Sequence, residues 1–145
     1  MERQRVTHLL DTATWSNSVT RPEVLPGRVR KLLGQAKQQK GLCSVSLLEC
    51  AIRHRRGRLQ FQGTLQDFFR AGLAADIELL DLTPDIAAAT CELPPDFPGD
   101  PFDRTIAATA RVLKLILITP DAIIRDTGFC LVEYYPFRPG PSTAS

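Results

Sequence analysis

Short apolar runs alternate with stretches of helical periodicity along most of the chain. The runs are four to six residues long, as expected for strands, and we place five of them at 6–10, 42–45, 77–82, 115–118 and 129–134. Apolar residues at helical spacing fill the intervals. They predict helices at 12–19 with Trp15 inward, from 24 or 28 to 40 with Gly41 as the stop, and at 46–56, 65–75, 84–93, 101–113 and after 121.

This alternation predicts an α/β fold. Strands joined by helices form a mainly parallel sheet with helices on both faces, so we expect a three-layer α/β/α sandwich with about five strands. At 145 residues the chain suits one hydrophobic core. We therefore expect a single domain over residues 1–135, followed by a Pro/Ser/Gly-rich tail at 136–145 that is disordered.

Composition and charge indicate the compartment of the protein and the kind of partner it could bind. No apolar run approaches the ~20 residues of a membrane-spanning helix, and residues 1–5 lack the apolar core of a signal peptide, so we expect a cytoplasmic protein. The four cysteines form no Cys-x-x-Cys pair and read as reduced core residues. Residues 1–58 carry twelve Lys/Arg and four Asp/Glu, whereas residues 59–145 carry six and twelve. The basic half either binds a polyanion beside an acidic site or is a solvated surface.

Four acidic residues fall where predicted strands end or the next helices begin. Asp11 follows the first strand, and Glu49 lies in the first turn after the second. Asp103 begins the helix that leads into the strand at 115–118, and Asp121 follows that strand. The carboxyl ends of parallel strands share one edge, so these acids could meet there. Their mutual repulsion would call for a hard cation such as Mg²⁺ or Mn²⁺.

Each acid also has a purely structural interpretation as a helix-start residue. Ser46 and Glu49 have the spacing of a capping box, and Asp103 could serve Asp100, the predicted N-cap, in the same way. Asp121 stands in a Thr-Pro-Asp segment that recurs at Asp85, where nothing indicates chemistry.

For Asp11 the structural interpretation is weakest, because Thr12 is the better cap candidate. The sequence also leaves open whether Asp100 or Asp103 is the third essential carboxylate. An N-cap side chain turns back onto its own helix, which favours Asp103.

Four ordered motifs resemble a known family. They are Leu9-Leu-Asp-Thr12, Ser44-Val-Ser-Leu-Leu-Glu49 with the basic run after it, Leu93-Pro-Pro leading to Asp100-Pro-Phe-Asp-Arg-Thr-Ile-Ala-Ala-Thr-Ala110, and Leu117-Ile-Thr-Pro-Asp121. Together they resemble a PIN domain, and within it the VapC-type toxin ribonucleases of type II toxin–antitoxin pairs. The resemblance covers roughly residues 6–135.

The resemblance implies metal-dependent cleavage of RNA, a cognate antitoxin and a homodimer. The family's four acids match Asp11, Glu49, Asp103 and Asp121. We expect Asp11 and Asp103 to bind Mg²⁺ or Mn²⁺ directly, Asp121 to do so directly or through water, and Glu49 to orient the attacking water or complete the second shell. The supporting positions are Thr12, Asp100 and Thr119.

A basic run follows the helix that carries Glu49. Its arginines, with one more beside Asp103, are candidates for binding RNA phosphates: Arg53, Arg55, Arg56, Arg58 and Arg104. The alternative is that cations are simply favoured at a helix C-terminus.

Two rival functions remain. A phosphotransferase with an aspartyl nucleophile would need a second Asp close to Asp11, and Asp-Thr-Ala-Thr lacks one. The other rival is a non-catalytic PIN-fold interaction module whose acids only cap helices.

Overall fold

A five-stranded parallel sheet forms the centre of the computed structural model, which describes residues 6–35, 39–73 and 77–137. The strand order is β3-β2-β1-β4-β5, and every pairing is parallel. The strands are β1 (Val6–Leu10), β2 (Gln39–Cys43), β3 (Ile77–Leu80), β4 (Ile116–Thr119) and β5 (Val132–Tyr134).

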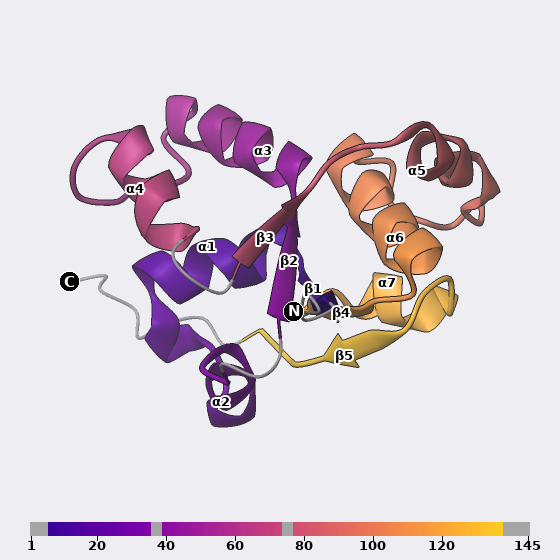
Figure 1. Cartoon of the computed structure of the whole chain (residues 1–145), viewed down its shortest axis with the longest axis horizontal. Helices are drawn as coiled ribbons and strands as arrows, with labels where there is room; N and C mark the ends of the chain where they lie inside the picture. The colour runs from indigo at the N-terminus through magenta and orange to yellow at the C-terminus, as the bar shows by residue number, and fades with distance from the viewer. Residues whose placement is uncertain (1–5, 36–38, 74–76, 138–145) are drawn as a thin grey trace, which may run out of the picture.

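Helices cover both faces of this sheet, so the predicted α/β/α sandwich is confirmed (Figure 1). One side carries α1 (Thr12–Thr20), α2 (Gly27–Leu33), α3 (Ser44–Arg55) and α4 (Leu65–Gly72). The other carries α5 (Pro84–Ala89), α6 (Pro101–Leu113) and α7 (Ala122–Thr127). Two short 3₁₀ turns, Pro22–Val24 and Thr90–Glu92, complete the elements. None of the helices in these described ranges is long and apolar enough to cross a membrane.

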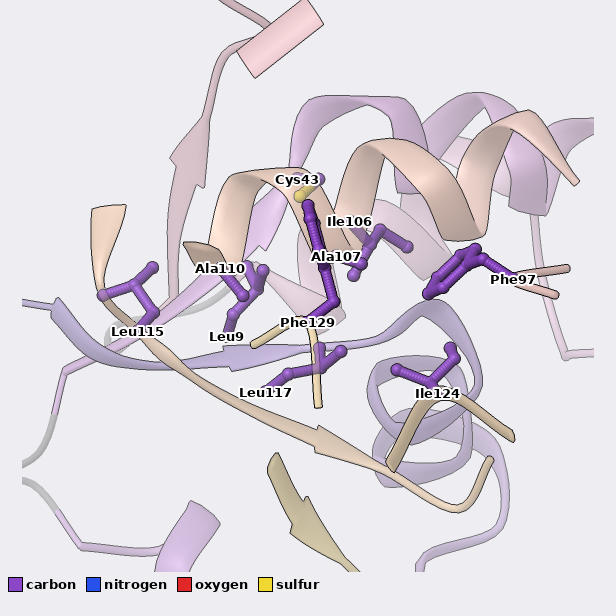
Figure 2. Packing of buried hydrophobic residues seen from close by; sticks show 10 residues of the cluster. All are labelled: Leu9, Cys43, Phe97, Ile106, Ala107, Ala110, Leu115, Leu117, Ile124 and Phe129. Atoms are coloured by element: carbon purple, nitrogen blue, oxygen red, sulfur yellow. The ribbon is translucent and has the colours of Figure 1, made fainter. Parts of the chain in front are cut away.

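Alternate residues of the central strands divide the interior into two cores. Leu9 and Leu117 point toward α6 and α7, where Ile106, Ala107 and Phe129 close the first core (Figure 2). The next residues along the same strands, Leu10 and Ile118, pack on the opposite face against the helices α1 to α4. Both faces of β4 are thus buried, as its continuous apolar run predicts, and β1 is buried on both faces at its carboxyl end.

In the second core, Trp15 of α1 packs against α4. Its ring is fully buried, as predicted, and makes an edge contact with Phe68 at a centroid distance of 5.3 Å. Its Nε1 donates a hydrogen bond of 2.8 Å to the carbonyl oxygen of Gly72. This close approach requires a residue without a side chain at position 72, since a Cβ there would lie 2.4 Å from the Trp15 ring.

The predicted helix from 24 or 28 to 40 is wrong at its end. α2 stops at Leu33, and Lys40 and Gly41 lie within β2. Lys40 is buried, and its ammonium donates to the carbonyl oxygens of Leu33 and Gln35 at the end of α2. Gly41 is not a helix stop but a packing position, where a Cβ would lie 2.6 Å from Leu80 Cδ1.

Other boundaries shift by a few residues. α3 begins at Ser44 rather than at 46, because β2 ends early at Cys43, and β5 begins at Val132 rather than at 129. The predicted extension of the fourth helix beyond Gly72 falls partly on residues 74 and 75, which lie outside the described residues. Of the predicted tail, Pro136 and Phe137 are described, whereas 138–145 lie outside the described part.

Replacing Gly72 by Ala tests the contact between α1 and α4. We expect Gly72→Ala to lower the free energy of unfolding by about 1–3 kcal/mol, because the new methyl group meets a buried ring that cannot move aside. Gly27→Ala is the matched control, since nothing lies within 4 Å of its Cβ position. Urea denaturation followed by circular dichroism measures both, and equal stabilities of the two variants would contradict this packing.

Candidate active site

A cavity of about 270 Å³ lies where β1 and β4 end, and all four candidate acids line it. Its lining residues are Asp11, Thr12, Ala13, Glu49, Arg53, Asp103, Pro120, Asp121 and Phe137. Larger hollows exist elsewhere on the described surface, such as one of about 730 Å³ beside α4, but that one has a single carboxylate, Asp67. Chemistry rather than size therefore identifies the candidate site.

One hydroxyl group connects the ends of β1 and β4. Thr119 is fully buried at the end of β4, and its Oγ1 donates a hydrogen bond of 2.6 Å to Asp11 Oδ2. The same oxygen accepts the N–H of Asp121 at 3.1 Å. Asp121 then caps α7 by accepting the N–H groups of Ile123 and Ile124 with Oδ1, so these capping bonds occupy one carboxylate oxygen. Thr119 thus fixes Asp11 and Asp121 together.

Asp11 is the N-cap of α1, and the expectation that Thr12 would cap this helix is wrong. Asp11 Oδ1 accepts the N–H of Thr14 at 2.7 Å. The hydroxyl of Thr12 instead donates to Ser46 Oγ on α3 at 2.9 Å. Burial raises the pKa of Asp11, against the opposing effect of the hydrogen bonds from Thr119 and Thr14. Each Asp11 oxygen accepts one of these bonds and retains a lone pair for a further ligand.

Glu49 is buried on α3, and the capping-box interpretation fails for it. α3 begins after Cys43 without a side-chain cap, so Ser46 is already helical and Glu49 does not reach back to a cap. Its Oε2 lies 3.4 Å from Arg53 Nη2. Its Oε1 is buried and has no hydrogen-bond partner among the described residues. A buried carboxylate oxygen without a partner is costly, so Glu49 is a candidate for binding a further ligand.

Asp103 faces the other acids from the first turn of α6. Burial and repulsion from Asp100, Glu49, Asp11 and Asp121 raise the pKa of Asp103 to about 7. Asp100 is exposed and caps α6, its Oδ1 accepting the Phe102 N–H at 2.7 Å. Asp100 lines a neighbouring cavity of about 410 Å³ rather than the one that contains Asp103. The placement of the two residues agrees with the geometric preference for Asp103.

The basic run divides into two groups. Arg53 lines both cavities, and Arg56 and Arg58 line the neighbouring one together with Asp100 and Phe102. Arg55 is exposed at the end of α3 and lines neither cavity. Outside this run, Arg104 donates through Nε to the carbonyl oxygen of Pro98 at 3.0 Å, which holds the loop before α6.

The donor set suits a hard divalent cation, because four carboxylates converge and one oxygen lacks a partner. Within the described ranges, no group of three or more His, Cys, Asp or Glu side chains lies in an arrangement that could hold a metal ion. An ion would therefore have to draw the carboxylates inward.

Sequence reasoning missed two parts of the site. Phe137 lines the acidic cavity although it falls in the predicted tail. Tyr135 is buried, and its hydroxyl lies 2.8 Å from Thr14 Oγ1. A sequence signal was present in the run Tyr134-Tyr135-Pro136-Phe137, because aromatic residues are unusual in a disordered tail. The average composition of the last residues did not reveal it.

Comparison with known proteins identifies related sequences and structures. The PIN domain family model matches residues 8–129. Ribonuclease VapC22 of Mycobacterium tuberculosis is 31% identical over 104 residues, which cover 70% of this chain and 79% of that protein.

Two solved structures share the fold. A chain of VapBC2 from Rickettsia felis bound to a DNA fragment from their promoter has a TM-score of 0.70 at 16% identity, covering 89% of this chain and 98% of that chain. A chain of a toxin–antitoxin complex from Klebsiella pneumoniae has a TM-score of 0.56 at 18% identity, covering 80% and 88%. Since the family model spans most of the sequence and all four acids of the cavity lie within the match, this chain belongs to the PIN domain family, in its VapC-type branch.

Proposed function

We propose that this protein is a metal-dependent endoribonuclease, the toxin of a toxin–antitoxin pair. The name of its relative, Ribonuclease VapC22, supports RNA as the substrate, and the converging acids support Mg²⁺ or Mn²⁺ as the cofactor. Asp11, Glu49, Asp103 and Asp121 form the proposed catalytic and metal-binding set.

The observation that carries the proposal is the unpartnered Oε1 of Glu49 beside three other carboxylates. Proteins bury polar atoms with partners, and a carboxylate that lacks one is destabilising unless a ligand completes it. A helix-capping role does not account for Glu49, because it lies in the second turn of an uncapped helix. A bound divalent cation accounts for all four acids together.

When bound, the divalent ion supplies a water of lowered pKa and polarises the phosphodiester. The residues of this chain set up that chemistry. Thr119 holds Asp11 in one rotamer, so the carboxylate does not have to be ordered when substrate arrives. Asp11, Asp103 and Asp121 supply oxygen ligands. Glu49 would orient the attacking water or complete the second shell.

The basic residues beside the site complete the proposed substrate surface. Arg56 and Arg58 line the cavity next to the acids and would pair with phosphates that flank the cut. Arg53 also forms an ion pair with Glu49, which partly offsets the negative charge of the site. Arg55, outside both cavities, we assign to the electrostatics of the α3 C-terminus.

We also propose a cognate antitoxin as the protein partner and a homodimer as the assembled toxin. The solved structure from Klebsiella pneumoniae that shares this fold is a toxin–antitoxin complex, which supports the first part.

The pH dependence of stability tests the crowding of the acids. The pKa of Asp103 is raised to about 7, so the folded protein holds its proton more tightly than the unfolded chain. That contribution is complete below the ordinary pKa of ~4 and is lost as pH rises through 7. We therefore expect the metal-free wild type to lose stability relative to Asp103→Asn between pH 4 and 8, by on the order of 1–2 kcal/mol after solvent screening.

Asp85→Asn is the matched control, because Asp85 is exposed in the first turn of α5 and does not line the acidic cavity. Chemical denaturation at several pH values in a chelator measures both variants. Parallel pH profiles for wild type and Asp103→Asn would show that the carboxylates do not interact. Saturating Mn²⁺ at ~100 times Kd should reverse the order by stabilising the wild type by ~2.7 kcal/mol.

RNA cleavage by two substituted proteins tests the function itself. Asp103→Asn keeps the side-chain shape but removes a ligand charge, so cleavage in Mg²⁺ or Mn²⁺ should fall at least ~100-fold, the scale of one lost electrostatic contact in a transition state. Asp100→Ala should keep measurable cleavage and lose about 1 kcal/mol of stability with the α6 cap. If Asp100→Ala is inactive at full stability and Asp103→Asn still cuts, the roles are reversed. A wild type that never cuts RNA would favour the non-catalytic interaction module.

A further inference from the structure

An exposed aromatic side chain stands in the wall of the acidic cavity. Phe137 is 53% exposed and lines this cavity with the four acids and Arg53. The apolar side chains that share this wall, Ala13 and Pro120, are small. Phe137 is in neither of the two sheet cores. Its position therefore leaves a large aromatic face beside charged groups and water.

The backbone that carries Phe137 is firmly attached to the site. Tyr135, two residues earlier, is buried, and its N–H donates to the carbonyl oxygen of Thr119 at 3.3 Å. The Tyr135 hydroxyl meets Thr14 Oγ1, and the Thr14 N–H binds Asp11. Pro136 alone separates this anchor from Phe137 and fixes one backbone torsion. The aromatic face is thus positioned by the same residues that position Asp11.

An aromatic face next to cationic groups matches one class of ligand well. Unpaired nucleobases stack on aromatic side chains while arginines hold the neighbouring phosphates, whereas the bases of a duplex are already stacked on one another. The acidic cavity adjoins the cavity of Arg56 and Arg58, and Glu49 and Arg53 line both. A single strand can therefore run from Phe137, past the acids, to these arginines.

We propose that Phe137 stacks on the nucleobase beside the scissile phosphodiester of the RNA. The proposal rests on the proposed ribonuclease function and adds a residue that contacts a base. It makes Phe137 a substrate-binding residue on one side of the cut, with Arg56 and Arg58 binding phosphates on the other side.

RNA binding by the non-cleaving Asp103→Asn protein tests this assignment. The probes are a labelled oligouridylate of about 12 nucleotides, within the site size usual for single strands, an abasic oligomer with the same phosphates, and the oligouridylate paired to its complement. Adding Phe137→Ala should weaken oligouridylate binding roughly 5- to 100-fold, as expected for one lost stack, and leave abasic binding unchanged. Phe137→Trp should restore binding, whereas Phe137→Leu should not. The duplex should bind poorly to every variant.

Salt dependence separates stacking from charge. Phe137→Ala should leave the slope of log affinity against log salt unchanged, whereas Arg56→Ala should reduce it by about 0.7 for one lost phosphate contact. Leu131→Ala is the control for a lost exposed apolar side chain, because Leu131 is 66% exposed and lines a different cavity, where β1 and β4 begin. It should bind RNA as the parent does.

Three results would overturn the proposal while the wild type still cleaves RNA. They are unchanged oligouridylate binding by Phe137→Ala, an equal loss toward the abasic oligomer, or full rescue by leucine. Equal binding of the duplex would also contradict stacking, because a paired base is not free to stack on Phe137. A wild type that neither cuts nor binds RNA in Mn²⁺ would instead overturn the ribonuclease function, and the stacking role with it. Circular dichroism melting confirms that each variant is folded.

Discussion

The hydrogen bond from Thr119 to Asp11 is the constraint on which the rest of the candidate site depends. It joins the ends of two adjacent parallel strands, and the same hydroxyl oxygen receives the N–H of Asp121. Because Thr119 is fully buried, its hydroxyl is shielded from solvent. Two acids are therefore fixed by the sheet itself, and the helices α3 and α6 bring Glu49 and Asp103 to them.

This arrangement sets stability against function. Burial and mutual repulsion raise the pKa values of Asp11 and Asp103, which is an energetic cost in the free protein. Two local interactions reduce this cost. Thr14 and Thr119 donate hydrogen bonds to Asp11, and Arg53 forms an ion pair with Glu49. The unpartnered oxygen of Glu49 remains. The sheet fixes Asp11 and Asp121 before any ligand binds, whereas an ion would have to draw the carboxylates of α3 and α6 inward.

Much of the fold could be predicted from the sequence, because buried parallel strands appear as continuous apolar runs. The prediction failed around Lys40 and Gly41, where a polar residue and a glycine resemble the end of a helix. Their roles depend on partners in other elements. Lys40 serves carbonyl groups at the end of α2, and Gly41 makes room for Leu80. Local propensity does not contain this information.

The candidate site, like the fold, could be predicted in its overall arrangement but not in its contacts between distant residues. The four acids could be placed together, since strand order along the chain brings strand ends to one edge. The hydrogen bonds at the helix starts around these acids could not be predicted from the sequence. Thr12 looked like the better cap, but Ser46, 34 residues later, takes its hydroxyl, and the capping box at Ser46 does not form. Phe137 was hidden because the average composition of the last ten residues suggested disorder, whereas the Tyr135 anchor is specific.

The central claim is that the four acids form a divalent-metal site, and a crystal structure of the wild-type protein grown in Mn²⁺ tests it most directly. Anomalous scattering at the manganese edge identifies the ion independently of any activity. The account predicts an anomalous peak in the acidic cavity, with Asp11 and Asp103 within the ~2.0–2.3 Å expected for oxygen ligands of such an ion. A cavity without a peak at millimolar Mn²⁺, with Arg53 still paired to Glu49, would contradict it.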